Sequence, residues 1–115
     1  MAQLGSVFLP VVSPRDSAAW YSAVFGLAVS SIQEHAAVLD SPDREFRLTL
    51  MGPTSGIAAP PGLTWAPFSL LVTDIEAARK SLVDRDPGPI TGDDRSCFWF
   101  TATDPDGNIL LICDR

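Results

Sequence analysis

The sequence predicts an α+β fold in which two βαβββ modules form a curved mixed sheet, a cup, with the helices outside. The first observation behind this prediction is an internal repeat, because the order strand, helix, strands recurs after about sixty residues. Residues 9–13 (LPVVS) correspond to residues 70–74 (LLVTD), and residues 46–51 correspond to residues 108–113. The second observation is a segment rich in glycine and proline between the two copies, which is typical of a linker. We therefore expect a single domain at residues 1–115, with module 1 at about 4–52, a linker at 53–66 and module 2 at about 67–115.

The first module begins with a β-branched apolar strand at residues 7–12. Ser13 is the predicted cap of the helix that follows, because Pro14 suits the first helical position and Asp16 stands where a capping box places its acceptor. The helix is expected to end at Gly26, which adopts the left-handed conformation without strain. Apolar patterns between turn residues predict three further strands, at 28–33, 36–40 and 46–51. Alternation in the last of these strands points Phe46, Leu48 and Leu50 toward the helix.

The second module repeats this order with a strand at 68–72 and a helix at 75–83. Thr73 is the predicted cap of that helix, with Glu76 in the capping-box position. Residues 84–92 are rich in turn formers, and we expect them to connect the helix to the terminal strands.

A hairpin is predicted at the end of the chain, where two apolar runs flank the turn at residues 104–108 (DPDGN). Proline presets the backbone of the turn, and Gly107 suits the positive φ that ends it. If Asp104 pairs with Asn108, Thr101 lies opposite Leu111. Both faces of the hairpin are apolar, so we expect both to be covered.

Charge and composition exclude several classes of partner. The net charge is −6 and there is a single lysine, so no basic patch is available for nucleic acid or an anionic membrane surface. No apolar run approaches the ~20 residues that a membrane span needs, and no secretion signal is visible, so a cytoplasmic location is expected. Cys97 and Cys113 both lie in the terminal hairpin, where we expect reduced core thiols rather than a disulfide.

Several short motifs together resemble a known family. They are Val11-x-Ser13, Ser17-x-x-Trp20-Tyr21, Gly26-Leu27, Val72-x-Asp74 and the run from Asp104 to Ile109. The chain is similar in these motifs to the vicinal oxygen chelate superfamily, which includes glyoxalases, bleomycin resistance proteins and extradiol dioxygenases. The resemblance implies two βαβββ modules in a cup-shaped sheet.

The resemblance also implies where a metal ion would be bound, because metal-using members place His, Glu or Gln at four strand positions facing the cup. In this sequence the matching positions are Ser6, Thr49 or Met51, Pro67 and Leu111. These side chains are a poor ligand set for a divalent metal. The only histidine, His35, falls in a predicted turn, where it is expected to be exposed. We therefore expect neither a metal nor another cofactor.

Strand alternation predicts what lines the cup. Eight residues are expected to face it and to bind a ligand: Phe8, Arg47, Thr49, Met51, Ser69, Trp99, Thr101 and Leu111. Such a lining is mostly apolar with a few polar groups, as in small-molecule pockets, unless its own side chains fill it. Phe8 and Trp99 are candidates to stack on a flat ligand, and Arg47 to pair with a carboxylate or phosphate. Trp65 is a candidate lid or dimer contact.

The expected function is metal-independent binding of a small, partly aromatic molecule, such as an antibiotic or metabolite, by a homodimer. No catalytic residue is assigned. One alternative is an enzyme of the same superfamily, of the lyase, isomerase or dioxygenase type, with a non-standard site. A second alternative is a small regulatory or interaction module.

Overall fold

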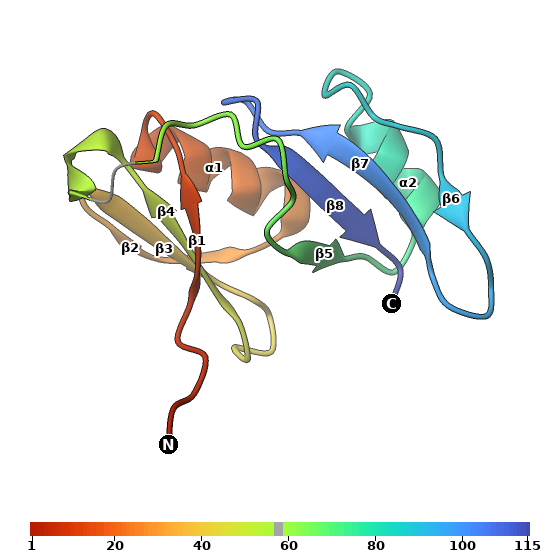
Figure 1. The fold of residues 1–115 in the computed structure, drawn as a ribbon, viewed down its shortest axis with the longest axis horizontal. Helices are drawn as coiled ribbons and strands as arrows, with labels where there is room; N and C mark the ends of the chain where they lie inside the picture. Colours follow the sequence, from red (N-terminus) through yellow and green to blue (C-terminus); the bar gives the residue numbers. More distant parts are fainter. Residues whose placement is uncertain (57–58) are drawn as a thin grey trace. The chain divides into compact units, whose positions relative to one another are not determined.

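A computed structural model describes residues 1–56 and 59–115 (Figure 1). The chain divides into two compact units, unit 1 at Met1–Pro61 and unit 2 at Gly62–Arg115. Each unit contains one βαβββ module with a four-stranded mixed sheet, so the α+β class and the repeated element order are confirmed.

Unit 1 has its four strands in the order β1-β4-β3-β2, with β1 parallel to β4 and the other neighbours antiparallel. The elements are β1 (Val7–Pro10), α1 (Pro14–Phe25), β2 (Ala28–Ile32), β3 (Ala36–Asp40) and β4 (Arg47–Met51), followed by a short 3-10 helix, η1 (Pro53–Ser55). The short 3-10 helix gives the predicted linker more regular structure than expected.

The predicted boundaries of α1 are confirmed. The side chain of Ser13 accepts a hydrogen bond from the backbone N–H of Asp16 at 3.2 Å, and Gly26 ends the helix with φ of 71°. The helix packs against β2, β3 and β4 and buries one face of the sheet. The core of unit 1 consists of Leu9, Ala18, Tyr21, Ala37, Leu39, Leu48 and Leu50, among others.

The prediction that Phe46 faces the helix is wrong. Its side chain is 65% exposed, because β4 begins one residue later and Phe46 still belongs to the preceding turn. There its backbone N–H donates to the hydroxyl of Ser41 at 3.2 Å. The side chains predicted to follow it on this face, Leu48 and Leu50, are buried.

Unit 2 has the same topology, with the order β5-β8-β7-β6 and β5 parallel to β8. The elements are β5 (Ser69–Leu71), α2 (Ile75–Ser81), β6 (Thr91–Gly92), β7 (Phe98–Thr103) and β8 (Ile109–Cys113). Thr73 is not the cap of α2, because the Asp74 carboxylate takes that role and accepts from the N–H of Ala77 at 3.0 Å. The short strand β6 lies at the end of the turn-rich segment 84–92 and is the first of the three strands that follow the helix in the βαβββ order.

The terminal hairpin has the predicted register. Thr101 lies opposite Leu111, and the N–H of Asp104 donates to the carbonyl of Asn108 at 2.9 Å. One face is covered, since Phe100 and Ile112 are fully buried. The other face is open, with Trp99 37% exposed, so the expectation of two covered faces is met on one side only.

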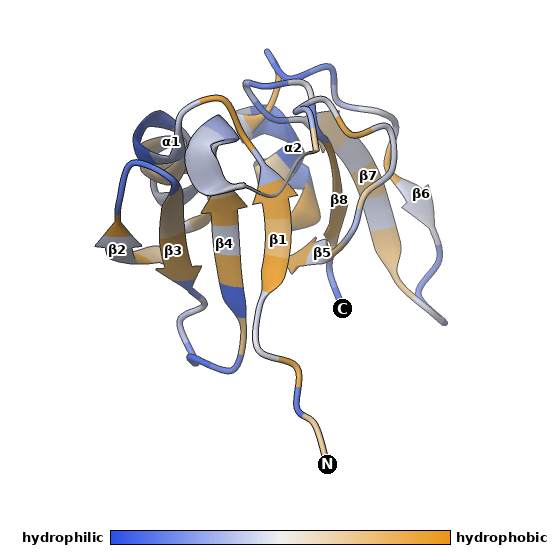
Figure 2. Cartoon of the chain, turned by 60° about the vertical axis from the view of Figure 1, so that its left-hand side comes forward, coloured by the Kyte–Doolittle hydropathy of each residue, from blue (hydrophilic) through white to orange (hydrophobic). Residues whose placement is uncertain are grey.

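Hydrophobic residues are concentrated in the strands, as Figure 2 shows for β1 and β8, whereas the turn between β3 and β4 is hydrophilic. Neither helix in the described part of the chain has the length and apolar character needed to cross a bilayer.

Candidate functional site

The sheet of unit 1 has an open face, formed by the residues that alternate with those packed on α1. Its rows follow from the strand register: Phe8 pairs with Thr49 and Thr49 with Val38, whereas Pro10 pairs with Met51 and Met51 with Ala36. At the end nearest the β3–β4 turn, Arg47 pairs with Asp40. The structure thus brings four of the predicted ligand-binding residues onto one face: Phe8, Arg47, Thr49 and Met51. Thr49 is itself buried, with 7% of its surface exposed.

The chemical character of this face changes along β4. From the turn end onward, the side chains are a guanidinium (Arg47), a hydroxyl (Thr49) and a thioether (Met51). The aromatic ring of Phe8, which is 52% exposed, lies beside the middle row. One end of the face is therefore charged and the rest is mainly apolar.

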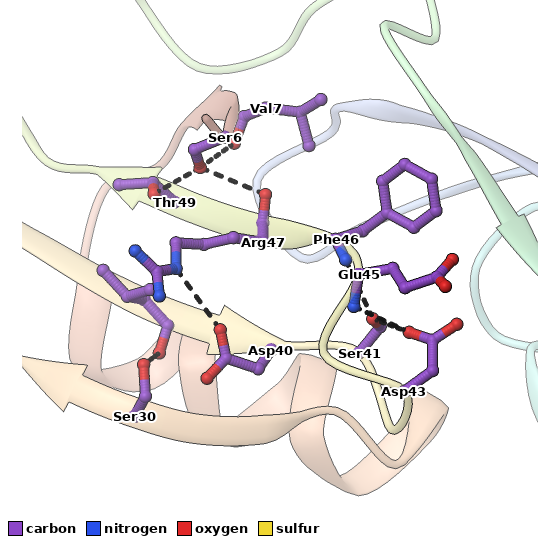
Figure 3. Close-up of polar contacts among 11 residues, drawn as sticks. Ser6, Val7, Ser30, Asp40, Ser41, Asp43, Glu45, Phe46, Arg47 and Thr49 are labelled. Carbon is purple, nitrogen blue, oxygen red and sulfur yellow. Dashed lines mark hydrogen bonds and ion pairs between the residues drawn. The ribbon is translucent and has the colours of Figure 1, made fainter. Parts of the chain in front are cut away.

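Two hydroxyls are paired in the middle of this face. Ser6 Oγ lies 2.7 Å from Thr49 Oγ1 and donates to the carbonyl oxygen of Arg47 at 3.0 Å (Figure 3). Ser6 Oγ also lies 3.2 Å from the carbonyl oxygen of Val7, and either hydroxyl can be the donor in the pair with Thr49. The pair ties the start of β1 to β4, and both hydroxyls have a protein partner.

Arg47 is oriented by an ion pair. Its Nε donates to Asp40 Oδ1 at 3.3 Å, and Figure 3 shows the side chain reaching across the sheet toward this carboxylate. The Arg47 side chain remains 57% exposed. Among residues 1–56 and 59–115, no hydrogen bond from its two terminal amino groups is found, so these two groups are available to bind a ligand.

A hollow of about 300 Å³ lies at this charged end. It is lined by Gly5, Asp40, Arg44, Glu45, Phe46 and Arg47. The β3–β4 turn that supplies several of these residues is fixed by its own hydrogen bonds, including Ser41 Oγ to Asp43 Oδ1 at 2.5 Å and Arg44 N to Ser41 O at 2.8 Å. The Ser41 hydroxyl, followed by the Glu45 backbone N–H, lowers the pKa of Asp43 below its ordinary 3.8. Arg44 takes a left-handed backbone with φ of 61°.

Unit 2 has an open face of its own. In one row Ser69 pairs with Leu111 and Leu111 with Thr101, and in the next Leu71 pairs with Cys113 and Cys113 with Trp99. Four predicted ligand-binding residues therefore share this face: Ser69, Trp99, Thr101 and Leu111. Leu71, which is 68% exposed, extends the apolar surface beside them.

Cys113 and Cys97 are free thiols on the hairpin. Burial, followed by the nearby Cys97 thiol, raises the pKa of Cys113 above its ordinary 9.0. Cys113 is therefore a neutral thiol at physiological pH and a weak nucleophile. Trp65 is well exposed in the irregular segment before β5, and its role as lid or interface stays a prediction.

The positions that correspond to metal ligands do not suit a divalent ion. Ser6 and Thr49 are hydrogen bonded to each other, whereas Pro67 and Leu111 have no donor atom in the side chain. No group of three His, Cys, Asp or Glu side chains that could hold a metal lies anywhere in the described part of the chain. The only histidine, His35, is exposed in the turn between β2 and β3, as predicted.

Sequence reasoning missed Asp40, Arg44 and Glu45 as members of a site. Asp40 had a usable signal, because a hairpin closed by the turn at residues 41–46 places Asp40 opposite Arg47. Arg44 and Glu45 had no such signal, since they line the hollow only because of how the turn folds.

Comparison with known proteins identifies one family. The model of the Glyoxalase/Bleomycin resistance protein/Dioxygenase superfamily matches residues 3–112. No curated protein matches the chain significantly. The solved structure of a member of that superfamily from Sphaerobacter thermophilus DSM 20745 is similar to this chain, with 20% identity, a TM-score of 0.78 and coverage of 98% of this chain and 97% of that chain.

Two further solved structures are similar. A bleomycin-binding protein complexed with bleomycin has 15% identity and a TM-score of 0.66, with 99% of each chain covered. A bleomycin resistance determinant encoded on the transposon Tn5 has 14% identity and a TM-score of 0.69, with 99% of this chain and 98% of that chain covered. At these identities the likeness shows the fold alone.

Proposed function

Since the chain belongs to the glyoxalase/bleomycin resistance protein/dioxygenase superfamily, we propose that it binds a small, partly aromatic molecule on its open sheet faces without a metal ion. The observation that carries this proposal is the asymmetry of the terminal hairpin. Phe100 and Ile112 on one face are fully buried, whereas on the other face Trp99 is partly exposed in the same row as the still more exposed Leu71, with Cys113 between them. Leaving such apolar area in water is unfavourable, and contiguous exposed apolar surface marks binding sites.

The polar groups on these faces support a small-molecule ligand. Thr101 and Ser69 flank Leu111 in one row, so hydroxyls lie next to the aromatic surface. In small-molecule sites, a small number of polar groups within a mainly apolar lining fixes the orientation of the ligand. Metal independence is part of the proposal because the side chains at Ser6, Thr49, Pro67 and Leu111 make a poor donor set.

We also expect a homodimer. Within the described residues, each sheet ends in edge strands that are paired on one side only: β1 and β2 in unit 1, and β5 and β6 in unit 2. Unpaired edges favour association with another strand. Light scattering on the purified protein measures the subunit number, and a monomer at high concentration contradicts this part of the proposal.

The binding proposal is tested by calorimetry in the presence of a chelator, with metal-free bleomycin and a panel of flat aromatic antibiotics and metabolites. We expect at least one compound to bind, and Trp99→Ala to weaken that binding by about tenfold or more, since a buried aromatic contact contributes on the order of 1–3 kcal/mol. Val83→Ala, at an exposed apolar residue after α2, is the control and should leave affinity unchanged. Absence of binding by the whole panel, or binding that requires added Zn²⁺ or Mn²⁺, contradicts the proposal.

A further inference from the structure

We propose that the ligand is a singly charged apolar carboxylate, whose acidic group is bound by Arg47 at the turn end of unit 1's open face and whose body lies over Phe8. This inference rests on the proposed function and names the chemical class of the molecule bound. It is carried by the arrangement of charge along β4 and by the hollow beside Arg47.

Arg47 is prepared to bind an anion. The hydrogen bond from its Nε to Asp40 holds the guanidinium in one orientation, and its terminal amino groups remain exposed. A guanidinium binds a carboxylate through two parallel N–H groups, so an arginine oriented in advance loses less conformational entropy on binding. Asp40 is the less exposed member of the pair, which fits a role in positioning Arg47 rather than in contacting solvent.

The charges around the hollow select for a single negative charge. Two guanidinium groups, from Arg44 and Arg47, and two carboxylates, from Asp40 and Glu45, belong to the six residues that line it. The chain as a whole carries −6, so a dianion is repelled both by the protein and by the two local carboxylates. A monoanion gains the bidentate contact with less repulsion.

The middle of the face accommodates an apolar body. Thr49 is already buried and is hydrogen bonded to Ser6, so a ligand that covers this part of the face leaves no hydroxyl unpaired. Phe8 pairs with Thr49, which is two residues after Arg47 on β4. The exposed ring of Phe8 therefore lies two residues along the strands from Arg47. Two strand residues span about 6.6 Å, which is about the reach from a carboxylate to a phenyl ring through a three-carbon chain.

The test compares 4-phenylbutyrate with its neutral amide, 4-phenylbutyramide, by calorimetry on the full chain. We expect the acid to bind about tenfold more tightly than the amide, because a charge-assisted bidentate contact exceeds a neutral one. Arg47→Gln should reduce the affinity for the acid to about that for the amide, and should change the affinity for the amide much less, because the amide makes only the weaker neutral contact. Inorganic phosphate should bind more weakly than the acid.

Two further variants separate the contact from general charge and folding effects. Arg44→Gly removes the second guanidinium at a position whose φ of 61° suits glycine, so the turn should persist while affinity for the acid falls about two- to fivefold. Arg15→Gln removes an equal charge from an exposed position on α1 and should change nothing.

The outcomes distinguish this inference from the proposed function. Equal affinity for acid and amide, or an acid preference that persists in Arg47→Gln, overturns the inference and leaves the binding proposal standing. Failure of both probes at concentrations up to about 10 mM, while a compound of the aromatic panel binds, also overturns the inference alone. If neither the probes nor the panel bind, both proposals fall.

Discussion

Asn108 Oδ1 accepts a hydrogen bond from the backbone N–H of Leu63 at 2.8 Å. The same oxygen accepts from the N–H of Gly62 at 2.9 Å, and the N–H of Ile109 donates to the carbonyl of Leu63 at 2.9 Å. The side-chain amide of the fully buried Asn108 donates in turn to Asp104 at 2.9 Å. The turn of the terminal hairpin therefore also fixes the segment that leads into β5.

Asn108→Ala should destabilise the protein by about 2–4 kcal/mol, because it leaves the N–H groups of Gly62 and Leu63 and the carboxylate of Asp104 without this partner. Urea unfolding followed by circular dichroism measures the change. Pro105→Ala, in the exposed part of the same turn, should cost no more than about 1 kcal/mol. Equal losses in the two variants contradict a clamping role for Asn108.

Gly92→Ala should destabilise the β6–β7 pairing by at least about 2 kcal/mol. Gly92 has φ of 107°, which other residues rarely adopt, and a Cβ there overlaps the carbonyl oxygen of Cys97. Gly5→Ala is the matched control, since a Cβ at Gly5 meets no atom within 4 Å. Its effect on the midpoint of thermal unfolding should be negligible, whereas an equally small effect of Gly92→Ala shows that the β6 turn relaxes freely.

Cys113 should react with iodoacetamide more slowly than Cys97 at pH 8. Burial and the neighbouring thiol raise the Cys113 pKa above 9.0, so the reactive thiolate forms only at higher pH. The Cys113 rate should keep rising as the pH passes above 9, and the folded state loses the benefit of the neutral thiol over the same range.

Peptide mass spectrometry of the unsubstituted chain follows the alkylation of each thiol separately, with both thiols in place. A Cys113 rate that reaches its plateau below pH 9 contradicts the raised pKa. Reaction in about 6 M guanidinium chloride, where burial is lost, should make the two thiols alike.

Local patterns were sufficient for much of the fold. The Ser13 cap, the Gly26 stop and the hairpin register depend on residues close together in sequence, so the sequence predicts them correctly. The Thr73 cap failed because Asp74, one residue later, is an equally good acceptor and local pattern does not choose between them. The prediction that Phe46 faces the helix failed because the turn extends one residue further than hydropathy indicates.

The candidate site was predictable only in part. Alternation correctly grouped Phe8, Thr49 and Met51 on one sheet face, because side chains on a strand alternate with period two. The role of Asp40 in orienting Arg47 could be recognised only from the distance between the two side chains in the structure. The hollow beside them could be recognised only once the fold of the β3–β4 turn was known. Whether a face is buried also depends on what packs against it, so the apolar pattern alone wrongly predicted that the Trp99 face would be covered.

The sequence by itself determined the repeated βαβββ order, the hairpin register and the identity of the residues on each sheet face, since these follow from local backbone preference and strand periodicity. Only the tertiary structure decided that Ser6 and Thr49 satisfy each other, that Asp40 orients Arg47, and that the turn motif ending in Asn108 holds residues 62 and 63. The first and last of these relationships join residues that are distant in the chain, and the contact between Asp40 and Arg47 depends on side-chain geometry, so all three exist only once the strands and turns have packed.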